Sequence, residues 1–228
     1  MGSFPLDAEG IWCQAWASSQ RTHRVLAPGT PALFLDRDGV VVEEVNYLHR
    51  IEDIALVAGA AGAIAAANRF GIPVVLVTNQ AGIGRGYYGW AEFSAVQGAL
   101  IAALAAENAA LDAVYACPHH PTGKSDPPHN DHPARKPNPG MLLRAEKDLG
   151  LNLERSWLVG DKSSDVEAAK RAGLAGALHV LTGHGQSERE AAMAFTTASF
   201  EVRLAPSITG ALELPLFVLG PDANTSTA

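Results

Sequence analysis

Cysteine is scarce in this sequence, and its scarcity limits the classes of protein to which the chain can belong. Only Cys13 and Cys117 occur among the 228 residues. A disulfide framework is therefore not expected, and a reducing compartment such as the cytoplasm fits best. Residues 1–7 also lack the basic start and apolar run of a signal peptide. No apolar run approaches the roughly 20 residues that cross a bilayer, so no membrane partner is expected.

Basic residues are also fewer than acidic residues in this sequence. Lysine and arginine together number 17 against 24 aspartate and glutamate residues, which gives a formal net charge of -7. Binding to nucleic acid needs a basic stripe, so nucleic acid is not an expected partner. A small anionic substrate is not excluded, because a phosphate site needs only a few local donors and a cation. The sequence carries no signal for the oligomeric state.

With 47% hydrophobic residues, the chain can bury a core. Segments with the apolar pattern of a strand alternate along it with segments that have the apolar pattern of a helix. Apolar runs typical of buried strands occupy residues 32–35, 72–77, 113–116, 156–159 and 177–181. Helical patterns occupy residues 59–70, 91–110, 140–149 and 165–172. This alternation predicts an α/β fold, Rossmann-like and doubly wound, with a mostly parallel sheet and helices on both faces.

We divide the chain into an N-terminal extension at residues 1–30, a single domain at residues 31–220 and a flexible tail at residues 221–228. In the extension, Trp12 and Trp16 fit one face of a short helix. The run Gly82-Ile83-Gly84-Arg85-Gly86 predicts a loop.

Polar residues follow the predicted strands at the points where those strands end. Asp36 and Asp38 come after the first strand, Thr78 ends the second, and Asp161 follows the fourth. In doubly wound folds ligands bind beyond the carboxyl ends of the strands, so these side chains are expected at one edge of the sheet. Each motif alone has a plainer interpretation, since aspartate is common in turns and Thr78 or Asp165 could be helix N-caps.

Taken together, the motifs resemble those of the haloacid dehalogenase (HAD) superfamily of phosphohydrolases. The matching segments, in the order of that superfamily, are Asp36-Arg37-Asp38-Gly39, Thr78-Asn79-Gln80, Arg135-Lys136-Pro137 and Gly160-Asp161 with Asp165. Further segments are similar to the subgroup that contains heptose bisphosphate phosphatases and histidinol-phosphate phosphatases. They are Asn46-Tyr47, the run from Thr78 to Gly86 and the run from Cys117 to Pro121. The resemblance covers about residues 32–182.

The resemblance implies a magnesium-dependent phosphomonoester hydrolase that acts through an aspartyl-phosphate on a small phosphorylated metabolite. D-glycero-D-manno-heptose 1,7-bisphosphate, cleaved at the 7-phosphate, is the favoured substrate. Histidinol phosphate is the alternative, and a non-catalytic sugar-phosphate-binding protein is a less favoured one. By the same resemblance Asp36 is the nucleophile, and Mg²⁺ is held by Asp36, the backbone carbonyl of Asp38 and Asp161. Asp38 would be the general acid and base.

Further roles follow from the resemblance. Thr78 and Lys136 would bind the transferring phosphoryl oxygens, and Asp165 would orient Lys136 or a metal-bound water. The expected substrate contacts are Arg37, Glu44, Val45, Asn46, Tyr47, Asn79, Gln80, Ala81, Arg135 and Lys162. Tyr47 could instead pack in the core, and Arg85 could reach a second phosphate or face solvent. Only about twenty residues separate Asp38 from the next helix, so no large cap domain is expected.

The loop between residues 117 and 139 departs from the pattern of its relatives, which often hold a structural zinc there. Cys117 and His119 match the first pair of zinc ligands, but the second pair reads His132-Pro133-Ala134, and Ala134 cannot bind metal. Cys117, His119 and His132 thus form a degenerate site, which His120 or His129 would have to complete. The loop holds seven prolines, which restrict its backbone. We therefore expect no bound zinc.

Overall fold

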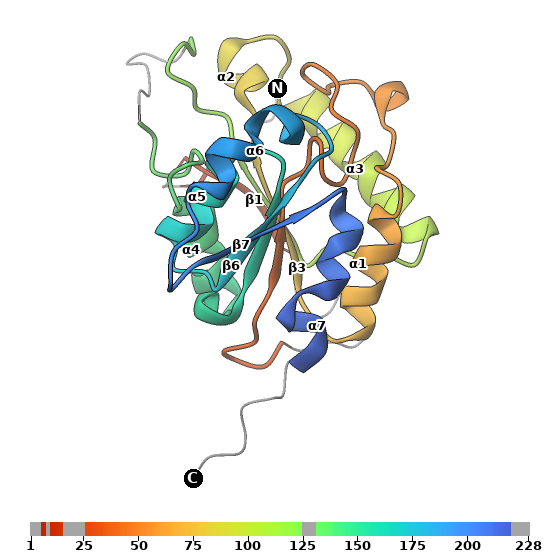
Figure 1. The fold of residues 1–228 in the computed structure, drawn as a ribbon. Coiled ribbons are helices and arrows are strands. Elements are labelled where there is room, and N and C mark those ends of the chain that lie inside the picture. Colours follow the sequence, from red (N-terminus) through yellow and green to blue (C-terminus); the bar gives the residue numbers. More distant parts are fainter. Residues whose placement is uncertain (1–5, 8–9, 16–25, 125–130, 220–228) are drawn as a thin grey trace.

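A central sheet organises the molecule, a computed structural model that describes residues 6–7, 10–15, 26–124 and 131–219 (Figure 1). Within these residues the sheet has seven strands, in the order β1-β4-β3-β2-β5-β6-β7. Strands β2 to β7 are parallel to their neighbours, and only β1 is antiparallel, at the edge beside β4. Their bounds are β1 Trp12–Ala15, β2 Leu33–Leu35, β3 Val74–Asn79, β4 Ala113–Cys117, β5 Trp157–Gly160, β6 Gly176–Val180 and β7 Glu201–Ala205.

Helices cover both faces of the sheet, as the alternating sequence pattern predicts. Helices α1, α3 and α7 lie on one face, and α4, α5 and α6 lie on the other (Figure 1). The α-helices are α1 Ala60–Arg69, α2 Ala81–Arg85, α3 Trp90–Ala106, α4 Gly140–Leu149, α5 Ser163–Arg171, α6 Gly185–Met193 and α7 Pro215–Leu219. The 3₁₀ turns are Ile51–Asp53, Leu153–Arg155 and Ile208–Glu213. The predicted doubly wound α/β fold is confirmed.

The central strands are built from residues that can be buried on both sides. Every residue of β2 is buried, and so is β3 from Val74 to Thr78. Such strands need apolar side chains on both faces because helices cover both. Helix α1 is followed by Gly71 with a φ of +78°, and α4 by Gly150 with a φ of +64°. Both glycines stand at the positions where the sequence predicted helix ends.

Strand order places the polar strand ends side by side. β2 lies between β3 and β5, and Leu35 is level with Leu76 on one side and with Val159 on the other. Asp36 therefore leaves the sheet between the end of β3 and Asp161, which follows β5. Residues 39–59, between Asp38 and α1, contain the 3₁₀ turn Ile51–Asp53 and no α-helix. The edge of the sheet is thus left without a large cap, as predicted.

Two local predictions were wrong. Trp12 opens strand β1 rather than a helix, because the extended chain there satisfies the backbone groups of the β4 edge. The predicted loop at 82–86 instead forms most of helix α2, and two glycines of this helix allow other segments to pack closely against it. A Cβ at Gly82 would lie 2.1 Å from Tyr88 Cε1, and one at Gly84 would lie 2.2 Å from the Pro118 carbonyl oxygen.

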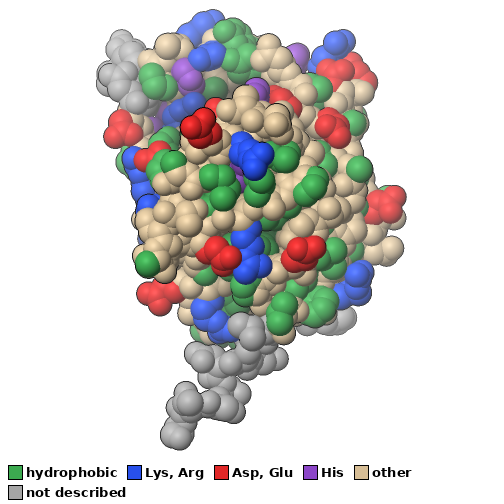
Figure 2. Space-filling model, in the orientation of Figure 1, with side chains coloured by type: hydrophobic (Ala, Val, Ile, Leu, Met, Phe, Trp, Pro, Cys, Tyr) green, Lys and Arg blue, Asp and Glu red, His purple; other side chains and the backbone are tan. Residues whose placement is uncertain are grey.

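Other expectations are not decided by the fold. Trp16 and the tail at residues 221–228 lie outside the described residues. The division into extension, domain and tail stays a prediction, although β1 of the extension joins the same sheet. None of the described helices is long and apolar enough to cross a membrane. On the face drawn in Figure 2, basic and acidic side chains are interspersed.

Candidate active site

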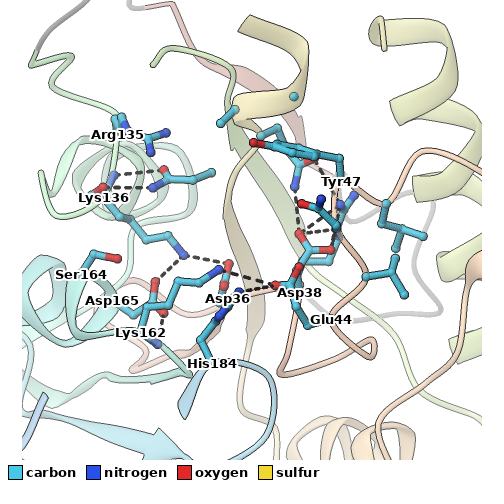
Figure 3. Close-up of a pocket in the computed structure, with 18 of the residues that line it drawn as sticks. Asp36, Asp38, Glu44, Tyr47, Arg135, Lys136, Lys162, Ser164, Asp165 and His184 are labelled. Atoms are coloured by element: carbon cyan, nitrogen blue, oxygen red, sulfur yellow. Dashed lines mark hydrogen bonds and ion pairs between the residues drawn. The ribbon is translucent and has the colours of Figure 1, made fainter. Parts of the chain in front are cut away.

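A polar cavity of about 480 Å³ opens at the carboxyl edge of the sheet. In Figure 3, Lys136, Asp165 and Lys162 approach it from one side and Asp38 and Tyr47 from the other. Fourteen of the residues predicted to act in catalysis or substrate binding line it: Asp36, Arg37, Asp38, Glu44, Val45, Asn46, Tyr47, Asn79, Gln80, Ala81, Arg135, Lys136, Lys162 and Asp165. The buried residues Thr78 and Asp161 lie outside this lining.

Lys136 is a buried cation held between two carboxylates. Its Nζ lies 2.8 Å from Asp36 Oδ1 and 2.7 Å from Asp165 Oδ1, and it donates a third hydrogen bond of 2.8 Å to the Val77 carbonyl. Burial alone would lower the pKa of Lys136, but the charges of Asp165 and Asp36 outweigh burial and raise it. The side-chain amide of Asn79 fixes the Lys136 backbone through bonds of 3.0 and 3.1 Å. The ammonium group is therefore charged and fixed beside Asp36.

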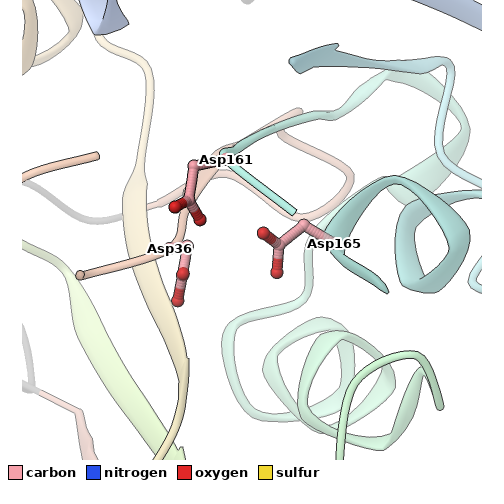
Figure 4. Close-up of side chains that lie close together, drawn as sticks. All are labelled: Asp36, Asp161 and Asp165. Atoms are coloured by element: carbon pink, nitrogen blue, oxygen red, sulfur yellow. The ribbon is translucent and has the colours of Figure 1, made fainter. Parts of the chain in front are cut away.

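Three aspartates converge beside this lysine (Figure 4). Among the described residues, Asp36, Asp161 and Asp165 form the one set of three His, Cys, Asp or Glu residues whose ligand atoms lie within 4.8 Å of one another. Both oxygens of Asp165 are engaged, Oδ1 with Lys136 and Oδ2 with the backbone N–H of Lys162 at 3.0 Å. This agrees with a role for Asp165 in orienting Lys136.

Asp161 is a buried carboxylate with one oxygen that no described residue contacts by a hydrogen bond. It is fully buried, and burial, followed by the charges of Asp36 and Asp165, raises its pKa to about 8. Oδ2 accepts a 2.7 Å bond from the His184 N–H, while Oδ1 is buried with no hydrogen-bond partner among the described residues. Because Mg²⁺ prefers carboxylate oxygens, the donor set of Asp36 and Asp161 fits this ion.

Two glycines close the space around Asp161. A Cβ at Gly39 would lie 2.5 Å from Asp161 Oδ2, and one at Gly183 would lie 2.3 Å from it. Their φ angles are +81° and +56°, a region that other residues rarely adopt. The backbone can therefore pass directly over the carboxylate. Gly39 belongs to the recognised segment Asp36-Arg37-Asp38-Gly39, whereas Gly183 lies beyond the recognised motifs.

A buried network surrounds Asp38. Arg37, only 1% exposed, donates from Nε and Nη2 to both oxygens of Asp38 at 3.0–3.2 Å. Gln80 donates to Asp38 Oδ2 at 3.1 Å and to Thr78 Oγ1 at 2.7 Å, and its carbonyl accepts a 2.6 Å bond from Tyr88. The side-chain amide of Gln80 thus links Asp38, the predicted general acid, to the hydroxyl of Thr78, which is predicted to bind phosphate. The predicted substrate contacts of Arg37 and Gln80 stay predictions.

Charged side chains occupy the rim of the cavity. Glu44 Oε2 lies 3.5 Å from both Lys162 Nζ and His184 Nε2. Burial, only partly offset by Lys162, raises the pKa of Glu44. Lys162 is 37% exposed at its side chain, so it can reach a bound anion. His184 was missed by the sequence analysis because it lies beyond the recognised motifs.

The two arginines named in the sequence motifs of this region, Arg85 and Arg135, differ in their relation to the cavity. Arg85 donates to the Tyr47 hydroxyl, and its Nη2 lies 3.0 Å from His120 Nε2. Arg135 donates a 3.0 Å bond to the His119 carbonyl and lines the cavity, whereas Arg85 does not. The sequence motifs predicted no substrate contact for five other cavity residues: Leu48, Gly82, Tyr88, Pro137 and Ser164. Gly82 and Pro137 fall within the recognised motifs, but no role was predicted for either.

The predicted degenerate zinc residues lie apart from the cavity lining. Cys117 ends β4, and burial raises the pKa of its thiol to about 11. The rings of His119 and His132 stack with their centroids 3.8 Å apart. A cysteine binds zinc as the thiolate, which this burial disfavours. The absence of zinc stays a prediction.

A doubly wound parallel sheet that presents aspartates and a buried lysine at its carboxyl edge defines a HAD-like phosphatase. Residues 133–203 match the HAD-hydrolase-like family model. The chain is 48% identical over 171 residues to the D-glycero-beta-D-manno-heptose-1,7-bisphosphate 7-phosphatase of Mesorhizobium japonicum, covering 75% of this chain and 76% of the relative. It is 39% identical over 194 residues to the D-glycero-alpha-D-manno-heptose-1,7-bisphosphate 7-phosphatase of Burkholderia mallei, covering 85% of this chain and 97% of the relative.

Solved structures agree with these relatives. A HAD-like phosphatase from Mesorhizobium loti superposes with a TM-score of 0.83 at 42% identity, covering 96% of this chain and 99% of the other. The D,D-heptose 1,7-bisphosphate phosphatase from B. bronchiseptica, solved with magnesium and phosphate, gives 0.70 at 29% identity, covering 80% and 96%. The chain therefore belongs to the HAD-like family of the D-glycero-D-manno-heptose-1,7-bisphosphate 7-phosphatases and is a hydrolase of phosphoric monoesters.

Proposed function

We propose that the chain hydrolyses the 7-phosphate of D-glycero-D-manno-heptose 1,7-bisphosphate, with Asp36 as the nucleophile. The observation that carries this proposal is the ion pair between Asp36 and Lys136 at the cavity, 2.8 Å long. It fixes one oxygen of the carboxylate and sets a cation beside the phosphorus that the carboxylate attacks. The names of the relatives support the substrate.

Magnesium supplies positive charge to the phosphoryl oxygens when it is bound. Asp36, Asp161 and the backbone carbonyl of Asp38 would hold it, and the B. bronchiseptica structure contains this ion. Lys136 would supply further positive charge to the transferring oxygens, and the Thr78 hydroxyl would bind them. Stabilisation of the charge that develops on these oxygens is the main contribution such residues make to phosphoryl transfer.

Asp38 moves the proton in each half of the reaction. In the first half, Asp36 forms an O–P bond, the ester O–P bond breaks, and Asp38 gives its proton to the departing sugar oxygen. In the second half, Asp38 takes a proton from water, which attacks phosphorus. The bond between Asp36 and phosphorus then breaks, and phosphate leaves. Asp38 is again protonated, and Asp36 is again a carboxylate.

Substrate choice rests on the rim of the open cavity. Arg135 and Lys162 are cations that line the cavity, and both are placed to meet an anionic substrate with a second phosphate. Glu44 and Asn46 also line the cavity and can accept or donate hydrogen bonds to sugar hydroxyls. The retention of Asp36, together with its buried lysine, supports turnover over a purely binding role. Localisation in the cytoplasm and the lack of a nucleic-acid partner stay predictions.

The test is a comparison of kcat/KM for the purified chain with magnesium. The substrates are the alpha and beta anomers of the heptose 1,7-bisphosphate and histidinol phosphate, and Asp36→Asn is the control for contaminating phosphatases. We expect kcat/KM for one heptose anomer to exceed that for histidinol phosphate by at least about tenfold, which is about 1.4 kcal/mol of transition-state discrimination. A preference of that size for histidinol phosphate would contradict the proposed substrate.

A further inference from the structure

The N-terminal segment lies against the loop that carries Arg135. Strand β1 pairs with β4, so that Trp12 is level with Ala116 near the end of β4. Gly10, two residues before Trp12, therefore meets the chain just after β4. There His119 Nε2 lies 3.2 Å from the Gly10 carbonyl oxygen, to which it donates.

The residue that meets Gly10 is half of a stacked histidine pair. The rings of His119 and His132 lie with centroids 3.8 Å apart and planes inclined by 20°. His132 Nδ1 accepts a 3.1 Å bond from the Ala134 N–H, and the His132 carbonyl accepts a 2.9 Å bond from the Arg135 N–H. The His119 carbonyl accepts a 3.0 Å bond from Arg135 Nη1. The pair therefore fixes both the backbone and the guanidinium of Arg135.

Gly10 leaves no spare room beside this pair. A Cβ at Gly10 would lie 2.8 Å from His119 Nε2 and 2.8 Å from His132 Nε2. Contacts this short are not tolerated, so a side chain here would push both rings aside. The two carbonyl oxygens that orient Arg135 belong to the same two histidines and would move with them.

The segment that carries Gly10 is itself anchored on both sides. Before Gly10, Asp7 forms an ion pair with Arg144 of α4. After it, the Trp12 ring meets Phe93 edge-on with centroids 5.0 Å apart, and the Arg37 guanidinium lies 5.6 Å from the Phe93 centroid. A displaced Gly10 therefore cannot retreat freely, and the strain of an added side chain falls on the histidine pair.

We propose that Gly10 is a positioning residue of the active site: through the His119–His132 pair, the N-terminal segment fixes Arg135 in the substrate cavity. This rests on the proposed function in one respect, namely that Arg135 contacts the part of the substrate beyond the transferred phosphate. The N-terminal segment around Gly10 is then part of the substrate site, although it lies outside the sequence motifs that resemble those of HAD phosphatases.

The test is Gly10→Ala, with Gly29→Ala as the matched control. Both glycines have left-handed φ angles, +71° and +79°, so alanine strains the backbone similarly at each. A Cβ at Gly29, however, has no atom of the described residues within 4 Å. We expect Gly10→Ala to raise KM for the heptose bisphosphate by about five- to tenfold with kcat changed less than about twofold, since small misplacements at a site are costly. Gly29→Ala should behave as wild type in both constants.

A double-mutant cycle separates positioning from general damage to the fold. Arg135→Ala should raise the same KM, and Gly10→Ala should add less than about twofold in that background, because the group it positions is gone. If Gly10→Ala does not fold, His119→Gln replaces it in the test. Glutamine keeps a donor for the Gly10 carbonyl but lacks the stacked ring, so this variant should raise KM in the same way. The proposal would be overturned if the fold-increases in KM of Gly10→Ala and Arg135→Ala multiplied in the double variant. It would also be overturned if Gly10→Ala and Gly29→Ala had the same kcat and KM.

A substrate-free measurement keeps this proposal distinct from the proposed function. Wild-type turnover of the heptose bisphosphate tests the substrate alone. Hydrogen–deuterium exchange over residues 119–135 tests the contact alone, and it should be faster in Gly10→Ala than in Gly29→Ala. Equal exchange in the two variants would overturn the positioning role, whichever substrate the enzyme prefers.

Discussion

Replacing Lys136 by methionine tests whether this buried cation compensates the aspartates around it. Methionine is also long and unbranched, but it cannot make the bonds of 2.8 and 2.7 Å to Asp36 and Asp165. The Lys136 side chain is 3% exposed and that of Asp165 is 1% exposed. Breaking a buried ion pair by removing one partner costs about 3–5 kcal/mol of unfolding free energy. With an m value of about 2–3 kcal/mol per M of urea, the unfolding midpoint should fall by about 1–2.5 M.

The assay is urea unfolding at pH 8 with a chelator present, so that no divalent cation substitutes for the lost ammonium. Lys147→Met on the exposed face of α4 is the control and should change the unfolding free energy by less than about 0.5 kcal/mol. The double variant Lys136→Met with Asp165→Asn should recover part of the loss, because one uncompensated carboxylate is then gone. Turnover with magnesium should fall by about 10²–10³-fold or more in Lys136→Met. A midpoint equal to that of Lys147→Met would refute the reasoning.

Three further predictions concern the metal, the loop and the Asp38 network. Because burial, and then Asp36 and Asp165, raise the pKa of Asp161 to about 8, this carboxyl is protonated in the metal-free protein below that pH. The stability that its proton provides is present at low pH and lost as pH rises through about 8. Calorimetry should show magnesium affinity falling by up to about tenfold per pH unit below 8, and a flat profile would contradict this. Elemental analysis of protein purified without added metal should find no stoichiometric zinc; one zinc per chain, lost in Cys117→Ser, would refute it. Gln80→Leu should lower kcat by about tenfold or more while KM changes less, whereas a rise confined to KM would assign Gln80 to the substrate.

The arrangement of the candidate catalytic groups could be predicted because it depends on strand ends. Short apolar runs gave the positions of β2, β3 and β5, and parallel strands bring their carboxyl ends to one edge. Asp36, Thr78 and Asp161 follow from that rule alone. The placement of Lys136 did not follow from strand order, since it lies in an irregular loop, and only the resemblance to phosphatases indicated it.

The surroundings of these groups could not be predicted because they depend on packing between distant segments. Gln80 is oriented by Tyr88 on one side and by Thr78 on the other, and an amide orientation of this kind has no sequence signature. His184 reaches the cavity from the start of α6, a helix that the sequence analysis did not anticipate. Strand β1 forms because the β4 edge is available to it, which the local sequence around Trp12 does not reveal.

Trapping the covalent intermediate tests the central claim most directly. Enzyme mixed with magnesium and the heptose bisphosphate is quenched during turnover and treated with borohydride, which reduces an aspartyl-phosphate to homoserine. Peptide mass spectrometry should find homoserine at position 36 in the wild-type protein and none in Asp36→Asn, which should also lack turnover. Full wild-type turnover with no homoserine at position 36, or with homoserine at another aspartate, would contradict the assignment of Asp36 as the nucleophile.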